Sequence, residues 1–423
     1  MDRDAARLRR TARPRIRSAG RRPWVIAVVA VCVLAVGVVV ARSHGQRATG
    51  RAGAGAVEAP ATSPTPTGVD TATAGATVRL EDVGGRCDGT FDNRAALAAG
   101  TARLRATGGV LSLPPGVCRV VQTARSGGVD LPTGVRLQGR SATSTLSLAC
   151  DSASSYRELV RVSGDRAALV NLRLVRSTPC QGVMLKVLPV RELTVADVTV
   201  DGGTGLGSGM NGIELAAGPG TLQQLRIRDC TVRNLEFGLF QASTTTTTSE
   251  DLSIDRCRFS GNTADDLEFN APTASMQQVT VRHSVFAGGG QFGIGLANVQ
   301  HATLSDNSFS GYAQEPVHIE DRSGWVQVTN NSFRQSYTRN TSWSTLILII
   351  NGSHAVAVTG NTFDSAPPII PKHCVYVGPG GSAASPSNIV VSDNTFKVTS
   401  ATKPWGIYGG QNITTSGNRI TSP

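Results

Sequence analysis

The chain has 423 residues, enough for one large domain or two of ordinary size. It is rich in glycine (47 residues) and only 5% aromatic, which suits short strands and tight turns better than helices. Of its formal net charge of +11, residues 1–77 contribute +8, because twelve arginines there oppose four acidic residues. The remainder has no basic patches with interleaved aromatics, so we expect no nucleic-acid partner.

The first 77 residues divide into three segments that we place outside the folded domain. Residues 1–23 form a basic tail, and residues 24–41 ("WVIAVVAVCVLAVGVVVA") contain neither a charge nor a proline. This run approaches the ~20 residues that a helix needs to cross a bilayer, and the arginines before it predict a cytoplasmic N-terminus and an extracellular bulk. A cleaved signal peptide, which would leave a secreted protein, is the alternative. Residues 42–77 are rich in Pro, Thr and Ala and predict a disordered stalk.

The first element expected in the remaining domain, residues 78–423, is a helix. Asp92 or Asn93 can cap its start, and Gly108-Gly109 ends it after about Thr107. We expect this helix to cover one end of the repeats that follow, and we assign it no catalytic role.

From about residue 130 the sequence repeats a short alternating strand, a polar turn and an aromatic or aliphatic residue, as in "LSIDRCRFSGN", "ATLSDNSFSGY" and "VAVTGNTFDSA". Aligning the turns gives a column that runs Val198, Cys230, Cys257, Ser284, Asn307, Asn331, Asn361, Asn394 and Asn418. Repeats of this length made of strands predict about 11 coils stacked as a parallel β-solenoid. The asparagines should hydrogen-bond between coils and hold the turns, without a chemical role.

Three phrases near the start of the domain carry a family resemblance: "DVGGRCDGTFDNRAAL" (82–97), "GGVLSLPPGVCRV" (108–120) and "LPTGVRLQG" (131–139). They resemble the N-terminus of the pectate-lyase superfamily, which includes polygalacturonases, phage tailspike depolymerases and epimerases. The resemblance covers nearly all of residues 78–423 and implies an all-β, single-stranded right-handed parallel β-helix with an N-terminal capping helix. It matches no catalytic subfamily closely: "FGIG" stands in place of the polygalacturonase Gly-His-Gly motif, and Arg-Ile-Lys is missing.

Seven cysteines follow the apolar segment, and we expect them in an oxidising compartment, where disulfides form. Cys230 and Cys257 are neighbours in the turn column, so adjacent coils bring them near disulfide distance. Two further pairs fit the architecture, which leaves Cys374 unpaired. The predicted disulfides are Cys87–Cys118, Cys150–Cys180 and Cys230–Cys257.

A second strand follows each turn, and its outward residues should share one face. The predicted central column of this face runs Glu214, Phe240, Glu268, Gly295, His318, Ile349, Tyr376 and Tyr408, with Asp266, Asn270, Glu320 and Asn351 beside it. Acids are concentrated in the middle, aromatics that could stack on sugar rings flank them, and Gly295 leaves a dent. The pattern predicts a groove for an extended polysaccharide.

The stretch "TADDLEFNAP" (263–272) supplies the centre of that groove. Strand alternation puts Asp266, Glu268 and Asn270 on the groove side, whereas Asp265 is interpreted as a turn residue. The candidate catalytic residues are Asp266, Glu268, His318 and Glu320. The candidate substrate-binding residues are Glu214, Phe240, Asn270, Tyr376 and Tyr408.

These residue types fit acid–base chemistry on a glycan. Clustered carboxylates raise one another's pKa, as a general acid requires, and carboxyl groups roughly 6.5–9.5 Å apart suit inverting glycoside hydrolysis. His318 could instead serve as the base of a lyase or epimerase. We identify no Arg/Lys pair of the kind that calcium-dependent pectate lyases use as base. Ca²⁺ is the one candidate cofactor, and the metal ligands are left open.

Two functions fit this pattern. The first is a membrane-anchored extracellular protein that processes a polysaccharide as a glycoside hydrolase, lyase or epimerase. The alternative is a non-catalytic surface protein that binds glycan or is structural, because the fold hosts both.

Overall fold

The computed structural model describes residues 75–123, 128–206, 208–218, 220–241, 248–270, 276–334, 345–365, 370–381 and 384–422. The predicted basic tail, the predicted membrane segment and nearly all of the predicted stalk therefore lie outside the described residues. Within the described part, no helix is both long enough and apolar enough to cross a membrane.

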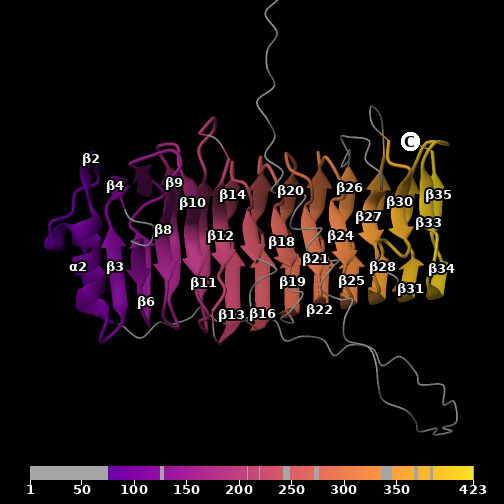
Figure 1. Cartoon of the computed structure of the whole chain (residues 1–423), viewed down its shortest axis with the longest axis horizontal. Helices are drawn as coiled ribbons and strands as arrows, with labels where there is room; N and C mark the ends of the chain where they lie inside the picture. The colour runs from indigo at the N-terminus through magenta and orange to yellow at the C-terminus, as the bar shows by residue number, and fades with distance from the viewer. Residues whose placement is uncertain are drawn as a thin grey trace, which may run out of the picture. The chain divides into compact units, whose positions relative to one another are not determined.

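The domain is a stack of coils in which corresponding strands of successive coils pair in parallel (Figure 1). One sheet has 11 strands, one for each of the predicted coils. The other has 24 strands in two ladders, which the long strands of two coils join into one sheet. The predicted parallel β-solenoid is thus confirmed.

The 11-stranded sheet consists of β5 (Val129–Leu131), β8 (Tyr156–Val162), β10 (Gln181–Val187), β12 (Met210–Leu215), β15 (Leu239–Gln241), β18 (Leu267–Asn270), β21 (Ile294–Ala297), β24 (Val317–Glu320), β27 (Thr345–Ile349), β30 (His373–Val377) and β33 (Lys403–Ile407). The first ladder of the 24-stranded sheet consists of β1 (Thr77–Arg79), β3 (Gly109–Leu113), β6 (Val135–Gly139), β9 (Ala168–Arg176), β11 (Thr194–Asp201), β13 (Thr221–Arg228), β16 (Thr248–Asp255), β19 (Met276–Arg282), β22 (Val299–Ser305), β25 (Gly324–Thr329), β28 (His354–Thr359), β31 (Ser387–Ser392) and β34 (Gln411–Ser416). The second ladder consists of β2 (Asp88–Asp92), β4 (Gly116–Gln122), β7 (Ser144–Cys150), β14 (Thr231–Arg233), β17 (Arg258–Ser260), β20 (Val285–Ala287), β23 (Ser308–Ser310), β26 (Ser332–Arg334), β29 (Thr362–Asp364), β32 (Thr395–Lys397) and β35 (Arg419–Thr421).

The core is continuous along the stack because each coil adds side chains of the same kind at the same place. The clearest case is a row of buried phenylalanines whose neighbouring rings stack with centroids 4.8 to 5.1 Å apart. It runs Phe259, Phe286, Phe309, Phe333, Phe363 and Phe396. A single coil could not bury such a ring on both faces, so neighbouring coils stabilise each other.

The asparagine column behaves as predicted. The backbone N–H of each residue from Ser284 to Asn394 donates to the side-chain Oδ1 of the next member, over 2.8 to 3.0 Å. Each asparagine also donates its Nδ2 to a backbone carbonyl of the preceding coil, as Asn331 does to Leu304 at 2.8 Å. These asparagine side chains therefore satisfy the buried backbone groups of the turns.

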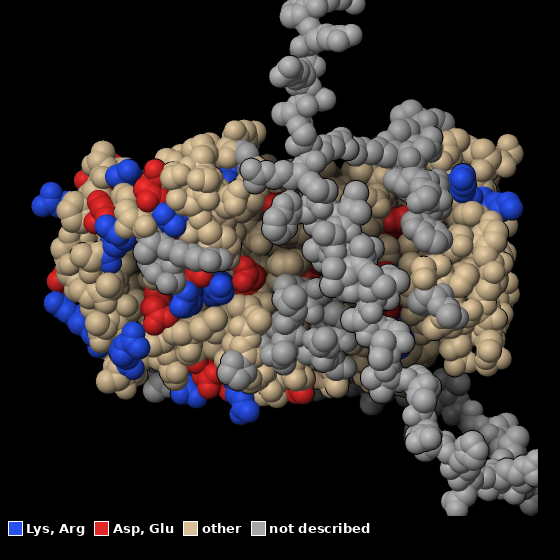
Figure 2. All heavy atoms as spheres, viewed as in Figure 1, with Lys and Arg blue, Asp and Glu red and all other residues tan. Residues whose placement is uncertain are grey.

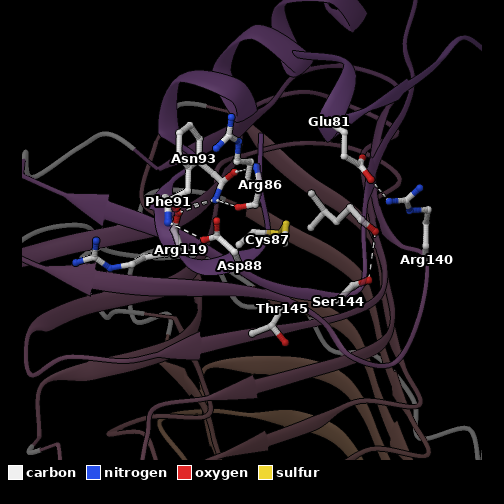
Figure 3. The surroundings of a disulfide bond; sticks show 12 residues. Glu81, Arg86, Cys87, Asp88, Phe91, Asn93, Arg119, Arg140, Ser144 and Thr145 are labelled. Carbon is white, nitrogen blue, oxygen red and sulfur yellow. Dashed lines mark hydrogen bonds and ion pairs between the residues drawn. A yellow bond between two sulfur atoms is a disulfide. The ribbon is translucent and has the colours of Figure 1, made fainter. Parts of the chain in front are cut away.

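The predicted capping helix is α2 (Arg94–Leu104), which follows the 3-10 helix η1 (Leu80–Val83) and lies at the N-terminal end of the stack (Figure 1). It ends three residues earlier than predicted, because the N–H groups of Thr107 and Gly108 both bond to the carbonyl of Leu104 in a closing turn. Asp92 accepts the N–H of Arg94, at 3.2 Å. The side chain of Asn93 instead ties together the backbone of its surroundings (Figure 3).

Two of the three predicted disulfides are formed, Cys87–Cys118 and Cys150–Cys180. The third is not: Cys230 and Cys257 are buried free thiols. They are in the same column as predicted, but each sulfur is directed to backbone carbonyls, with Cys230 Sγ 3.1 Å from the oxygen of Arg228 and Cys257 Sγ 3.4 Å from that of Asp255. Cys374 is likewise a free thiol, and it lies in the core.

Candidate active site

The outward face of the 11-stranded sheet carries the candidate residues. Strand register confirms the first part of the predicted column, in which Glu214, Phe240, Glu268, Gly295 and His318 follow one another on successive coils. Glu320 is two coils from Asn270 in the adjacent column, with Ala297 between them.

The second part of the predicted column is wrong by one position in β27. Leu348 pairs with His318, whereas Ile349 pairs with Ile319. The run "LILII" is apolar at every position, so its alternation does not indicate which residues face outward. Further on, Gly406 rather than Tyr408 is in register with Tyr376.

Glu268 lies at the centre of the face, and the glycine beside it makes room for its side chain. A methyl group placed on Gly295 would collide with Oε2 of Glu268. The Glu268 carboxyl group therefore lies over the coil of Gly295 and points toward the coil of His318. Burial raises the pKa of Glu268 to about 8, and the nearby charge of Asp265 adds to this effect. Glu268 is therefore protonated at neutral pH.

Asp266 does not lie on this face, contrary to the prediction. Regular strand geometry begins only at Leu267, and the Asp266 side chain turns into the interior, where it is 2% exposed. It accepts hydrogen bonds from Asn262 Nδ2, at 2.6 Å, and from the Tyr312 hydroxyl. Burial raises the pKa of Asp266 to about 7. With its oxygens engaged inside the coil, Asp266 is a structural carboxyl group.

Asp265, which was interpreted from the sequence as a turn residue, is the aspartate that contacts Glu268. Its carboxyl group accepts the N–H of Phe292 at 3.0 Å and hydrogen-bonds with the side chain of Glu268. Burial raises the pKa of Asp265 to about 7. The turn before β18 could have revealed this role of Asp265. Because the strand starts only at Leu267, strand alternation does not determine where the side chains of the two preceding aspartates point.

His318 is held between two carboxyl groups. Its Nδ1 is 3.6 Å from Glu315 and its Nε2 is 3.5 Å from Glu320. Glu315 is fully buried and was not identified from the sequence. Burial disfavours the imidazolium, but Glu315 and Glu320 outweigh that effect and raise the pKa of His318 to about 10. The ring of Phe292 contacts the imidazole edge-on, at 4.7 Å between centroids.

Glu320 differs from Glu268 in its protonation. Burial alone would raise the pKa of Glu320, but the hydrogen bond and charge of His318 lower it below its usual value. Asn351 also donates to Glu320, at 3.2 Å. We refer to Asp265, Glu268, Glu315, His318 and Glu320 as the carboxylate–histidine cluster. At neutral pH it combines a protonated carboxyl group, an ionised one and an imidazolium.

Glu214 lies toward the N-terminal end of the same face. Its carboxylate accepts a hydrogen bond from the hydroxyl of Tyr156, at 3.1 Å, and is 3.6 Å from Lys186 Nζ. Lys186 and Arg161 precede it in the same column. Both cations are paired with the buried carboxylate of Glu158.

Aromatic side chains flank the cluster. Phe240 lies one coil before Glu268, with its ring centroid 4.5 Å from that of Phe237. Toward the C-terminus, Tyr376 and Tyr408 stack at 5.0 Å despite their different register, and Tyr408 is 54% exposed. The Tyr408 hydroxyl is 2.7 Å from Nε2 of His373, which the sequence analysis missed. The stacked rings of Tyr376 and Tyr408 form a platform, and the His373 ring contacts both of them edge-on.

The structure offers calcium no specific support. Among the described residues, no group of three or more His, Cys, Asp and Glu side chains could hold a metal ion. Figure 2 shows Lys and Arg gathered mainly over the N-terminal coils, where Asp and Glu are interspersed with them, and a few further acidic side chains toward the middle of the view.

Comparison with known proteins gives the fold. Residues 189–333 match the model of the family described as "Right handed beta helix region". A search of curated proteins finds no match. The mannuronan C-5 epimerase AlgE6 A-module of Azotobacter vinelandii is similar in structure, at 16% identity and a TM-score of 0.50, over 82% of this chain and 99% of that one. So is the gp42 tailspike of an Acinetobacter phage, at 14% identity and a TM-score of 0.58, over 82% and 63% of the two chains. The chain is therefore a right-handed parallel β-helix protein, the fold that the resemblance to the pectate-lyase superfamily implied.

Proposed function

We propose that this protein is a polysaccharide-processing enzyme that hydrolyses a glycosidic bond on the outer face of β18, β21 and β24. The observation that carries the proposal is the opposite protonation of Glu268 and Glu320, which lie two coils apart with His318 beside them. Two neighbouring carboxyl groups whose environments separate their pKa values make an acid–base pair.

In the proposed reaction, Glu268 donates its proton to the glycosidic oxygen as the bond between that oxygen and the anomeric carbon breaks. Water adds to the anomeric carbon and gives its proton to Glu320. Two coils separate the residues by about 10 Å of stacking, which leaves room for this water as in inverting enzymes. Asp265, hydrogen-bonded to Glu268, is placed to return a proton to it.

In this scheme His318 does not act as a base. A proton already occupies it up to a pH of about 10, so it cannot accept another at neutral pH. It instead keeps Glu320 ionised. The proposal therefore favours hydrolysis over lyase or epimerase chemistry that would use His318 as base.

The substrate class has independent support from the shape of the site. An extended, ring-built polymer fits a row of coils with aromatic side chains at both ends of the cluster, since Phe240 and the Tyr376–Tyr408 platform offer flat apolar surfaces. The similar structures include an epimerase named for its action on mannuronan.

The test is the release of reducing ends from a panel of polysaccharides. Glu268→Gln and Glu320→Gln should each lower turnover by about 10²–10⁴-fold, the usual contribution of a general acid or base. Glu250→Gln, on β16 of the other sheet, is the matched control and should leave turnover unchanged. Products that absorb as unsaturated uronates would identify a lyase instead. Binding of a polysaccharide without any product would support the non-catalytic alternative.

We also propose that residues 24–41 anchor the enzyme in a membrane with the β-helix outside. The apolar run, the arginines before it and the two disulfides of the domain support this arrangement. Full-length protein should sediment with membranes and resist extraction by high salt, while deletion of residues 1–41 should abolish that association. A mature N-terminus beginning near Arg42 would show that the run is a cleaved signal instead.

A further inference from the structure

A tryptophan on the outer side of the 24-stranded sheet departs from the pattern of its column. Successive coils of the first ladder carry a residue with a left-handed backbone, and strand register aligns these residues. With φ between 50° and 58°, the column includes Asp251, Gln278, His301, Trp325, Ala355 and Asn388. Short polar side chains tolerate this conformation, whereas a bulky aromatic one is strained in it. Backbone strain that a fold retains concentrates at functional sites.

The indole of Trp325 is packed against two histidines and is still open to solvent. The His301 ring of the preceding coil stacks on it, with centroids 5.0 Å apart and planes 13° from parallel. His354 contacts the indole at a steep angle of 79°, and its ring lies over Gly324. Trp325 is nevertheless 52% exposed. The two histidines therefore fix the orientation of the indole without covering it.

The surface is lower beside the indole, over the next coil. β25, β28 and β31 follow one another in the sheet (Figure 1), and β28 has alanine at two outward positions, 355 and 357. Trp325 and Asn388 are two coils apart, about 10 Å by stacking, with only the methyl group of Ala355 between them. A flat ring against the indole takes up one coil spacing, as His301 does on the other side. The space over β28 therefore admits one further ring. We define the Trp325 recess as Trp325, Gln327, Ala355, Ala357, Asn388 and Val390.

The lining of the recess combines a flat apolar wall with uncharged hydrogen-bonding groups. Strands β25, β28 and β31 contain no Asp, Glu, Lys or Arg. Gln327 and Asn388 supply amide groups, and Asn388 is oriented by a hydrogen bond that its Oδ1 accepts from Asn412, at 3.0 Å. Val390, which is 37% exposed, extends the apolar surface. A pyranose ring has matching surfaces, because its C–H groups stack on an aromatic ring while its hydroxyl groups at the edge hydrogen-bond to amides.

We infer that the Trp325 recess is a second glycan-binding site, which takes an uncharged sugar unit of a polysaccharide. The recess belongs to the 24-stranded sheet, whereas the carboxylate–histidine cluster belongs to the 11-stranded one. Binding in the recess requires no reaction at Glu268, so this site goes beyond the proposed function and stands without it. A polymer held there keeps its remaining units at a high local concentration around the protein.

The fluorescence of the indole reports on this site directly. Full-length protein in detergent is titrated in the cold with cellohexaose, mannohexaose and the hexamer of N-acetylglucosamine, three uncharged probes. The emission of Trp325 is the difference between the unmodified protein and Trp325→Asn, and at least one hexamer should change it, because a stacked sugar removes water from the indole. Asparagine is the residue that the column has at 388, so Trp325→Asn should melt no lower than the unmodified protein.

Filling the recess should block binding while the indole stays in place. Ala355→Gln introduces a side chain that the same column holds at 278, and it should weaken the affinity read from Trp325 at least about tenfold. The matched control is Gln224→Ala, four coils before Trp325 in this column, which should leave that affinity unchanged.

Three results would overturn the inference. The first is a Trp325 emission that none of the three hexamers changes, and the second is an equal affinity in Ala355→Gln. The third is self-association of the unmodified protein, measured by sedimentation velocity, that Trp325→Asn abolishes, because the recess would then bind a second copy of the chain. None of these results bears on the proposed reaction, which Glu268→Gln tests separately.

Discussion

Gly295 shows how a residue without a side chain shapes a catalytic face. It lies between Glu268 and His318 in the column, and the Glu268 carboxyl group occupies the space that a side chain at 295 would fill. We expect Gly295→Ala to displace that carboxyl group and lower turnover at least tenfold. The midpoint of thermal unfolding should barely change, because only the end of a flexible side chain has to move. Gly381→Ala, where a methyl group meets open space, is the control. Normal turnover in Gly295→Ala would remove Glu268 from its proposed role.

The pH profile of the enzyme should follow the two carboxyl groups. Turnover should fall as pH rises through about 8, where Glu268 loses its proton, and should also fall at low pH once Glu320 becomes protonated. The measurement is kcat/KM across the pH range. In Glu268→Gln the residual rate should lose the alkaline decline. An alkaline decline that persists unchanged in this variant would mean that another group supplies the proton.

Asp266 makes stability depend on pH through its burial. The folded protein holds the Asp266 proton up to a pH of about 7, whereas an exposed aspartate releases it near 3.8. Folding therefore binds a proton between these values, and the free energy of unfolding falls as pH rises through that window. Asp266→Asn removes this contribution. We expect the melting temperature of the variant, relative to the unmodified protein, to rise by several degrees from pH 4 to pH 8. A difference that stays constant with pH would show that Asp266 is ionised in the fold.

At the scale of the element, the asparagine column carries the turns of five coils. Asn331 donates to Leu304 of the coil before it and receives the N–H of Asn307. Asn331→Ala leaves a buried N–H and a buried carbonyl without partners, which should cost about 1–3 kcal/mol for each group. The matched control is Gln327→Ala on the exposed side of β25. Chemical denaturation of both variants measures the difference, and equal stabilities would contradict the role of the column.

The sequence predicts elements of this kind well and their boundaries less well. The turn column and the coil count follow from a repeat that the same core imposes on every coil. Three features escape that reasoning. Strand β27 is apolar on both faces, so its register has no polar marker. Whether Asp265 or Asp266 contacts Glu268 depends on where β18 starts. Glu315 lies in a turn outside the repeated pattern.

At the scale of the whole molecule, two disulfides cross-link the N-terminal coils of the stack. Cys87–Cys118 and Cys150–Cys180 close loops of 31 and 30 residues. Loops of this size stabilise a fold by about 3–4 kcal/mol each when closed by a disulfide. Reduction should therefore lower the melting temperature of the protein. Cys230→Ser and Cys257→Ser should not reproduce this effect of reduction, because these two cysteines form no disulfide. If either variant matched the reduced protein, a third disulfide would have to exist.

The connections between strands vary in length from coil to coil, and this bears on how such a protein can change over evolutionary time. The column spacings vary between 23 and 33 residues, yet every turn stays in register. Extra residues are therefore accommodated between strands, at the borders of the 11-stranded sheet, without disturbing the pairing of its neighbours. A lineage could lengthen, shorten or exchange these connections, or duplicate a whole coil, while the scaffold stays intact. The chemistry of the face can thus drift toward new sugars without the fold having to be invented again.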